Sequence, residues 1–359
     1  MKKYQKKEAC CGCGACAEIC PAKAVTMIRD QEGFCYPQVN QSVCTECGKC
    51  RQVCPVGEQE RGGGLKLYLG AQAKDEGLRY SSSSGGVFAV LAEYVIERQG
   101  SVYGAGYDGN MRVIHTEASD QILLERIKRT KYVQSSMEGI YRRIEKNLEE
   151  NRWVLFCGTP CQAQALMLFL KKTYEKLIVV DLVCYGVPSP GIWEDYVRYL
   201  EHKHRGKMTV FSFRDKRNKD NGHVRSYVID GVEYVDSLYQ DIYCKMYFRN
   251  YILRPSCHHC KFCSVDRNSD FTIGDFWSID CVRPDLEDGM GTSMVIVHSE
   301  RGKRIWKEIE GEFVWFVCEK KDLLQPRLLS QTSQARVRWI FWLLYRCLPF
   351  WMIAKLMER

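Results

Sequence analysis

Eight cysteines near the start of the chain stand at the spacing that binds iron–sulfur clusters. They form two identical C-x2-C-x2-C-x3-C-P runs, Cys10, Cys13, Cys16 and Cys20 before Pro21, and Cys44, Cys47, Cys50 and Cys54 before Pro55. In proteins with two such runs, three thiolates of one run hold one cluster and its fourth cysteine ligates the other cluster. The spacing therefore predicts one 4Fe–4S cluster on Cys10, Cys13, Cys16 and Cys54, and a second on Cys44, Cys47, Cys50 and Cys20. Zinc is the alternative, but its sites usually use pairs of cysteines.

Two further cysteines follow neighbouring predicted strands near the middle of the chain. In Phe156–Gln162 (FCGTPCQ), Thr159 suits a helix N-cap and Pro160 suits the first helical position. Cys161 then lies in the first turn, where the helix dipole favours a thiolate. Cys184 follows the next strand, so both cysteines are expected at the sheet edge where α/β proteins bind ligands.

A third cysteine run, Cys257, Cys260 and Cys263, also has metal-ligand spacing. We expect a third 4Fe–4S cluster on Cys161, Cys184, Cys257 and Cys260, with Cys263 as a substitute ligand. A zinc knuckle is the alternative, because His258 and His259 offer other ligands.

The run Ser81–Gly86 (SSSSGG) precedes an apolar segment with helical character. Small residues and free N–H groups before a helix suit an anionic ligand such as a flavin phosphate, although such runs also occur in ordinary loops. The segment Lys131–Ser135 offers polar groups after a predicted helix.

The elements that carry these residues predict a small ferredoxin domain followed by a mixed α/β domain. A short hairpin is expected over 25–28 and 34–36, and a hinge at 61–64. Strands are then expected at 65–71, 101–107, 113–115, 153–156, 177–183 and 294–298, and helices at 87–96, 120–128, 137–150, from 160 and at 300–310. Asp230-Gly231 predicts a further hairpin. Alternating strands and helices predict an α/β core that is parallel in part.

Composition narrows the class of protein. The chain has 359 residues, 20 cysteines and a formal net charge of +8. Cysteines at ligand spacing and a start without an apolar signal core predict a cytoplasmic location. The charge is spread along the chain without a nucleic-acid motif, so no nucleic-acid partner is expected. The aromatic and basic tail at 339–355 suits either packing on the protein's own core or peripheral contact with a membrane.

The motifs SSSSGGVFAVLAEYVIE, KYVQS, FCGTPCQ, VCYGVPSP, FSFRDKR, LRPSCHHCKF and SDFTIGDFW occur in this order over about residues 65–300. In this order they resemble the family of coenzyme F420 hydrogenase/dehydrogenase beta subunits. The resemblance implies a flavin domain in two parts, 61–150 and 151–312, between a ferredoxin domain at 1–60 and an extension at 313–359. Cys157 and Cys263 are particular to this chain.

The resemblance also implies FAD and a 4Fe–4S cluster in the larger domain. It assigns cofactor-binding roles to Ser83, Ser84, Gly85, Gly86, Lys131, Tyr132, Gln134, Gly274 and Asp275. Hydride transfer to a flavin does not strictly require an acid or base. Lys131, Asp275 and His115 are candidate proton carriers, with a structural role as the equal alternative for each.

The expected function is that of an oxidoreductase between a two-electron substrate, with coenzyme F420 first, and ferredoxin or a partner redox subunit. A ferredoxin-dependent reductase of another organic substrate, in surface-polysaccharide metabolism for example, is one alternative. An electron-relay subunit of a larger complex is another.

Overall fold

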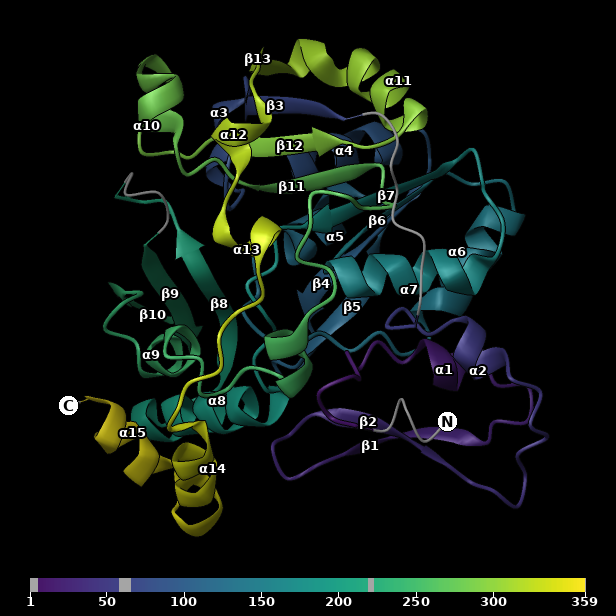
Figure 1. Ribbon diagram of the computed structural model, residues 1–359. Helices are drawn as coiled ribbons and strands as arrows, with labels where there is room; N and C mark the ends of the chain where they lie inside the picture. Colours follow the sequence, from purple (N-terminus) through teal and green to yellow (C-terminus); the bar gives the residue numbers. More distant parts are fainter. Residues whose placement is uncertain (1–5, 58–65, 219–222, 359) are drawn as a thin grey trace.

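The structure is a computed structural model that describes residues 6–57, 66–218 and 223–358. Its centre is an eight-stranded mixed sheet in the order β13-β3-β12-β11-β7-β6-β4-β5 (Figure 1). The strands are β3 (Leu67–Ala73), β4 (Ser101–Tyr107), β5 (Val113–Ala118), β6 (Val154–Gly158), β7 (Leu177–Leu182), β11 (Phe271–Asp275), β12 (Ser293–Val297) and β13 (Phe313–Val317). The four strands β11, β7, β6 and β4 are parallel, and antiparallel strands extend the sheet on both sides. The expected partly parallel α/β core is confirmed.

Helices cover both faces of this sheet, which explains why its central strands are apolar runs. The helices α4 (Val87–Glu97), α5 (Gln121–Ile127) and α11 (Glu300–Ile309) share one hydrophobic core with the sheet. The helices α6 (Ile140–Glu149) and α7 (Pro160–Leu170) pack against the other face. Short connections include α3 (Glu76–Tyr80), η2 (Pro255–His259), α10 (Ile279–Val282), η3 (Pro284–Leu286), η4 (Glu310–Glu312), α12 (Lys320–Leu323) and α13 (Pro326–Leu329).

A second core lies beside the main sheet. Its antiparallel sheet has the order β10-β9-β8, formed by β8 (Met208–Asp215), β9 (Val224–Ile229) and β10 (Val232–Ser237). Asp230 and Gly231 make the turn between β9 and β10, as predicted. The helices α8 (Pro190–His204), α9 (Ile242–Phe248), α14 (Arg338–Cys347) and α15 (Phe350–Glu358) pack with this sheet.

The N-terminal cysteine runs form a small module beneath α6 and α7 in Figure 1. It contains the predicted hairpin, β1 (Val25–Arg29) with β2 (Cys35–Val39), and two short helices, α1 (Ala15–Glu18) and α2 (Lys49–Gln52). Ala15, Ile19 and Val53 enter the same core as α6 and α7, so the module is packed onto the α/β domain. The expected hinge at 61–64 lies outside the described residues.

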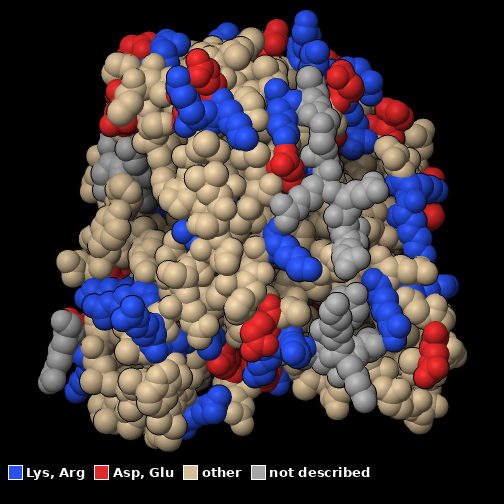
Figure 2. Space-filling view, in the orientation of Figure 1, with Lys and Arg blue, Asp and Glu red and all other residues tan. Residues whose placement is uncertain are grey.

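The C-terminal tail packs on the protein through one face only. Phe341 and Trp342 of α14 and Ile353 of α15 are buried in the second core. In contrast, Trp339 and Trp351 are 67% and 51% exposed. Figure 2 shows uncharged surface over these two helices at the lower left, bordered above by a group of basic side chains, and the middle of this face is also largely uncharged. Within the described residues, no helix is long and apolar enough to cross a membrane.

Candidate functional site

The first cysteine run lies against the α/β domain, and the second run faces solvent. Cys13 is buried, whereas Cys47 is exposed. Burial, followed by the neighbouring charges of Cys10, Cys54 and Cys50, raises the pKa of Cys16 to about 12. Cys16 is therefore close to two of the cysteines with which it is predicted to share a cluster, and thiols packed this closely become thiolates only beside a cation.

Three side chains of the α/β domain hold the first run in place by bonding its backbone. Arg254 Nε donates to the Cys10 carbonyl at 2.7 Å, and Gln134 Nε2 donates to the Cys11 carbonyl at 2.9 Å. The Tyr141 hydroxyl donates to the Cys13 carbonyl at 2.8 Å. These contacts fix the loop that surrounds the predicted first cluster.

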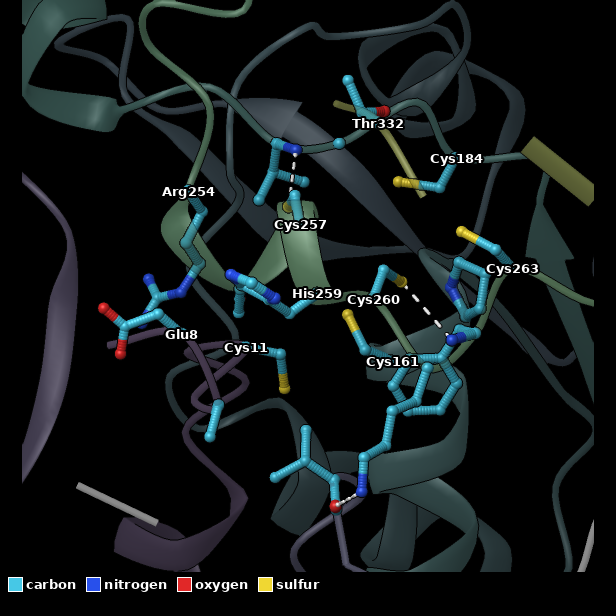
Figure 3. A pocket seen from close by; sticks show the side chains of 18 of the residues that line it. Glu8, Cys11, Cys161, Cys184, Arg254, Cys257, His259, Cys260, Cys263 and Thr332 are labelled. Carbon is cyan, nitrogen blue, oxygen red and sulfur yellow. Dashed lines mark hydrogen bonds between the residues drawn. The ribbon is translucent and has the colours of Figure 1, made fainter. Parts of the chain in front are cut away.

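The other cysteines expected to bind a cluster come together around one cavity of about 460 Å³. Cys161, Cys184, Cys257 and Cys260 all line this cavity, as do Cys263 and Cys11 (Figure 3). Thr159 caps α7 with a capping box and Pro160 begins the helix, so Cys161 is in its first turn as predicted. Cys184 follows the parallel neighbour of β6, at the same edge of the sheet. The 3-10 helix η2, which follows α9 in the chain, brings Cys257 to the same cavity.

The surroundings of these sulfurs favour thiolates beside a cationic group. The Val187 N–H donates to Cys257 Sγ at 3.4 Å, and the Phe262 N–H donates to Cys260 Sγ at 3.4 Å. Contact with Cys263 and the Phe262 N–H lower the pKa of Cys260 to about 7, against the effect of burial. Burial and the thiols of Cys260 and Cys161 instead raise the pKa of Cys257 to about 12. Several thiols that repel each other's charge fit a group that supplies positive charge of its own.

The cysteine sulfurs of this site surround a cavity and do not converge on one point. Across residues 6–57, 66–218 and 223–358, no three His, Cys, Asp or Glu side chains gather as closely as one ion needs. The sulfurs instead line the walls of a cavity, which suits a cubane held from several sides. Of the two histidines offered as zinc ligands, His259 lines the cavity, whereas His258 Nδ1 lies 3.0 Å from the Thr332 carbonyl oxygen.

The serine–glycine loop before α4 lies within a group of basic side chains. Lys128 Nζ donates to Ser81 Oγ at 3.2 Å, and Arg129 Nε donates to the Ser81 carbonyl at 3.2 Å. Lys216 Nζ donates to the Ser84 carbonyl at 2.6 Å. None of these three basic residues was predicted from the sequence to have a role. The quoted motif FSFRDKR, which contains Lys216, was the signal available for that residue.

Within this basic group Lys128 is paired with Glu125, whereas Lys216 donates only to the carbonyl oxygens of Arg79 and Ser84. Lys216 is only 1% exposed, and burial together with the charges of Arg79 and Arg214 lowers its pKa to about 7. Asp275, the nearby carboxylate, forms an ion pair with Arg214. A buried lysine bonded to carbonyl oxygens and surrounded by other cations fits an anionic group such as a diphosphate.

The loop residues themselves are fixed mainly by backbone contacts. Ser83 Oγ accepts from the Thr130 N–H at 2.8 Å, and Ser84 Oγ donates to the Thr292 carbonyl at 2.9 Å. At Gly85 a Cβ atom would lie 2.2 Å from the Ala71 carbonyl oxygen, so only glycine fits there. Gly86 is the N-cap of α4.

The other residues predicted to bind the cofactor make their contacts in different parts of the structure. They are Asp275, Tyr132, Lys131 and Gln134. Asp275 and Tyr132 both contact Arg214. Lys131 Nζ donates to the carbonyls of residues 126, 128 and 129, and burial is the main cause that lowers its pKa to about 7. Gln134 has both ends of its amide engaged at the ferredoxin module, with Cys11 and Arg254.

Two other residues predicted to act at the site, His115 and Gly274, are closely packed against neighbouring residues of the protein. His115 is buried, with its ring nitrogens 2.9 Å from Ser135 Oγ and 3.1 Å from the Cys157 carbonyl oxygen. Burial lowers its pKa to about 4, so the ring is neutral at pH 7. Gly274 lies in β11, where a Cβ atom would meet the side chain of Val183 at 2.8 Å.

Comparison with known proteins finds family matches for two segments of the chain. Residues 151–318 match the family described as coenzyme F420 hydrogenase/dehydrogenase, C terminus of the beta subunit, and residues 9–58 match the 4Fe–4S dicluster domain. The F subunit of the F420H2 dehydrogenase from Methanosarcina mazei is 26% identical over 195 residues, which cover 49% of this chain and 53% of that protein. The chain thus spans about half the length of this curated relative.

A chain in a xenon-derivatized structure of the F420-reducing [NiFe] hydrogenase complex from Methanosarcina barkeri is 16% identical to this one. The alignment covers 83% of this chain and 90% of that chain, with a TM-score of 0.46. The predicted family resemblance and the 4Fe–4S domain are confirmed by the family matches.

Proposed function

We propose that this chain is an iron–sulfur flavoprotein oxidoreductase. The proposal starts from the match of residues 151–318 to the C-terminal region of coenzyme F420 hydrogenase/dehydrogenase beta subunits. It would exchange electrons between a two-electron substrate and a ferredoxin-like carrier or a partner redox subunit. The observation that carries the proposal is the cavity lined by Cys161, Cys184, Cys257 and Cys260, directly against a 4Fe–4S domain.

The proposed cofactors are two 4Fe–4S clusters in the ferredoxin module, a third on the four cysteines of the cavity, and FAD. When bound, a flavin takes up electrons in pairs and releases them singly, and each cluster carries one electron. The donor sets fit these groups, with thiols for the clusters and a basic, carbonyl-lined loop for the flavin diphosphate.

The protein's own residues would bind, orient and screen these groups. Gly85 lets the serine–glycine loop approach β3 closely, and Lys216 and Arg129 supply positive charge beside it. Arg214 holds the Asp275 carboxylate at the carboxyl end of β11. Asp275 therefore remains the better placed of the proposed proton carriers, since the Lys131 ammonium is bonded to three backbone carbonyls.

Coenzyme F420 is the first candidate substrate because a relative in Methanosarcina mazei is a subunit of F420H2 dehydrogenase. The alternative is a ferredoxin-dependent reductase that acts on another organic substrate, such as one in surface-polysaccharide metabolism. A relay subunit without its own substrate would need no flavin, and the basic group around Lys216 argues against that role.

Anaerobic mixing of the flavin-loaded protein with reduced coenzyme F420 tests the substrate. We expect flavin absorbance to bleach first and cluster absorbance to follow. If neither bleaches while reduced ferredoxin still reduces both, F420 is the wrong substrate and the ferredoxin-dependent alternative is favoured. A purified holoprotein without flavin would overturn the flavoprotein proposal and favour the relay.

A further inference from the structure

One cysteine outside the predicted ligand sets lies between two of them. The Cys11 side chain lines the same cavity as Cys161, and it lies near enough to Cys13 and Cys161 for those thiols to shift its pKa. Cys13 is a predicted ligand of the first ferredoxin cluster, and Cys161 is a predicted ligand of the third cluster. Figure 3 shows Cys11 on one side of Cys161, with Cys184 and Cys263 on the other.

The backbone around Cys11 is held firmly by the α/β domain. Arg254 is 1% exposed and donates to the carbonyls of Cys10 and Cys35, at 2.7 and 2.9 Å. The Arg254 guanidinium donates to Gln134 Oε1 at 2.9 Å, and Gln134 Nε2 in turn donates to the Cys11 carbonyl at 2.9 Å. A Cβ atom at Gly12 would lie 2.5 Å from the Arg254 guanidinium, so a larger residue there would displace this clamp.

The second cysteine run reaches the cavity only through Val56 and Gly57, which follow Cys54 and Pro55, and the Lys261 Nζ atom donates to the Val56 carbonyl at 2.9 Å. Cys47 of this run is exposed, as are the adjoining residues Thr45 and Glu46. Among the residues that line the cavity, those from the ferredoxin module are Glu8, Ala9, Cys11, Val56 and Gly57. The only cysteine among them is Cys11, so the first run is the one that meets the third set of thiols.

We infer that Cys11 is a connecting residue, not a ligand, through which single electrons pass between the first ferredoxin cluster and the third cluster. The inference rests on the proposed function, because it requires both clusters. One centre is oxidised and the other reduced by one electron, and no bond forms or breaks. The exposed second run would then face the external one-electron carrier, giving the order carrier, second cluster, first cluster, third cluster.

The test uses the full-length holoprotein with Cys11→Ala, and Cys35→Ala as the matched control. Cys35 also lies in the ferredoxin module outside both runs. Oxidised protein is mixed with reduced bacterial-type ferredoxin, a carrier too large to enter the cavity, and freeze-quenched samples are followed by electron paramagnetic resonance. A Cys161→Ser protein supplies the spectrum without the third cluster.

We expect Cys11→Ala to keep the iron content and the cluster spectra of the unmodified protein. In Cys11→Ala the signals of the two ferredoxin-module clusters should appear as fast as in the unmodified protein, and the signal of the third cluster several-fold more slowly. Cys35→Ala should change neither rate. An unchanged third-signal rate in Cys11→Ala would overturn the connecting role. Loss of one cluster's iron would also overturn it, by making Cys11 a ligand. Absence of the third signal from the unmodified protein would instead contradict the proposed function.

Discussion

Arg338 in α14 forms a buried ion pair with Glu32 in the ferredoxin module, although 306 residues separate them in the sequence. Their side chains are 8% and 10% exposed. Arg338 also donates to the Leu253 carbonyl at 3.0 Å, directly before Arg254. The C-terminal tail thus helps to hold the ferredoxin module beside the cysteine cavity.

Substitution of Glu32 by Gln should destabilise this docking strongly. Leaving one charge of a buried pair without its partner costs about 3–5 kcal/mol. Arg29→Ala is the control, because Arg29 joins the same ferredoxin module to Glu194 of α8 but is 46% exposed. Exposed pairs contribute at most about 1 kcal/mol. Thermal unfolding should show the larger loss for Glu32→Gln, and equal losses would contradict this account.

Substitution of Cys161 or Cys257 by Ser should remove one cluster and leave those of the ferredoxin module. Each variant should lose about four iron atoms per chain, the content of one cubane. Cys318→Ser is the control, since Cys318 does not line the cavity. Iron analysis of anaerobically purified protein makes the measurement. Unchanged iron in both variants would refute this ligand assignment.

Substitution of Gly85 by Ala should reduce flavin binding. The added Cβ would lie 2.2 Å from the Ala71 carbonyl oxygen and 2.5 Å from the Ser293 nitrogen, so the loop must move. Overpacking of this kind typically costs about 1–3 kcal/mol. Gly109→Ala, with nothing within 4 Å of its added Cβ, is the control. The flavin released from each purified protein is compared, and equal flavin in both would remove this loop from the proposed binding site.

Titration of His298 should make the fold less stable as the pH falls below about 6.5, the pKa of a histidine in the unfolded chain. Burial is the main cause that lowers the pKa of His298 to about 4 in the folded state. Between these values the unfolded chain binds the extra proton, so stability decreases with falling pH and becomes independent of this group below about pH 4. The full effect is at most about 3 kcal/mol.

The measurement is chemical denaturation at several pH values, with His298→Gln for comparison. His298 Nε2 lies 2.8 Å from Thr272 Oγ1, and the Gln amide can keep a donor to this hydroxyl. The variant should lose less stability than the unmodified protein between pH 6.5 and pH 4. Parallel pH profiles for the two proteins would show that His298 does not titrate in this way.

The exposed aromatic side chains of the tail should bind a membrane surface weakly. Trp339 and Trp351 stand on the outer faces of α14 and α15, and amphipathic helices with Trp and basic residues favour anionic interfaces. Sedimentation with vesicles that contain anionic lipid should retain part of the protein. The Trp339→Ser, Trp351→Ser double variant should reduce that fraction, whereas Trp277→Ser, 63% exposed on another segment, should not. Equal retention of all three would exclude the tail as the contact.

Features encoded by neighbouring residues were predicted well from the sequence. Thr159 and Pro160 specify the start of α7 through a cap and a fixed φ angle, and the structure has both. Asp230-Gly231 specified the turn between β9 and β10. The convergence of Cys161 and Cys184 followed from the rule that parallel strands end at one edge of a sheet.

Contacts between distant segments could not be predicted in this way. Cys11 had no spacing partner, and its place beside Cys161 depends on how the ferredoxin module packs against α7. Gln134 was assigned to the flavin pocket through its motif, yet its amide bonds Cys11 and Arg254. The expected boundary at 312 stands directly before β13, which joins the main sheet through β3. Each of these depends on long-range packing that local residue patterns do not encode.

The central claim is that this chain holds three clusters and a flavin, and cofactor analysis of anaerobically purified full-length protein tests it most directly. Iron, acid-labile sulfide, zinc and released flavin would be measured on one sample. The account predicts about twelve iron atoms per chain, four for each of three cubanes, with equal sulfide and one FAD. A colourless protein that contains zinc and neither iron nor flavin would contradict it.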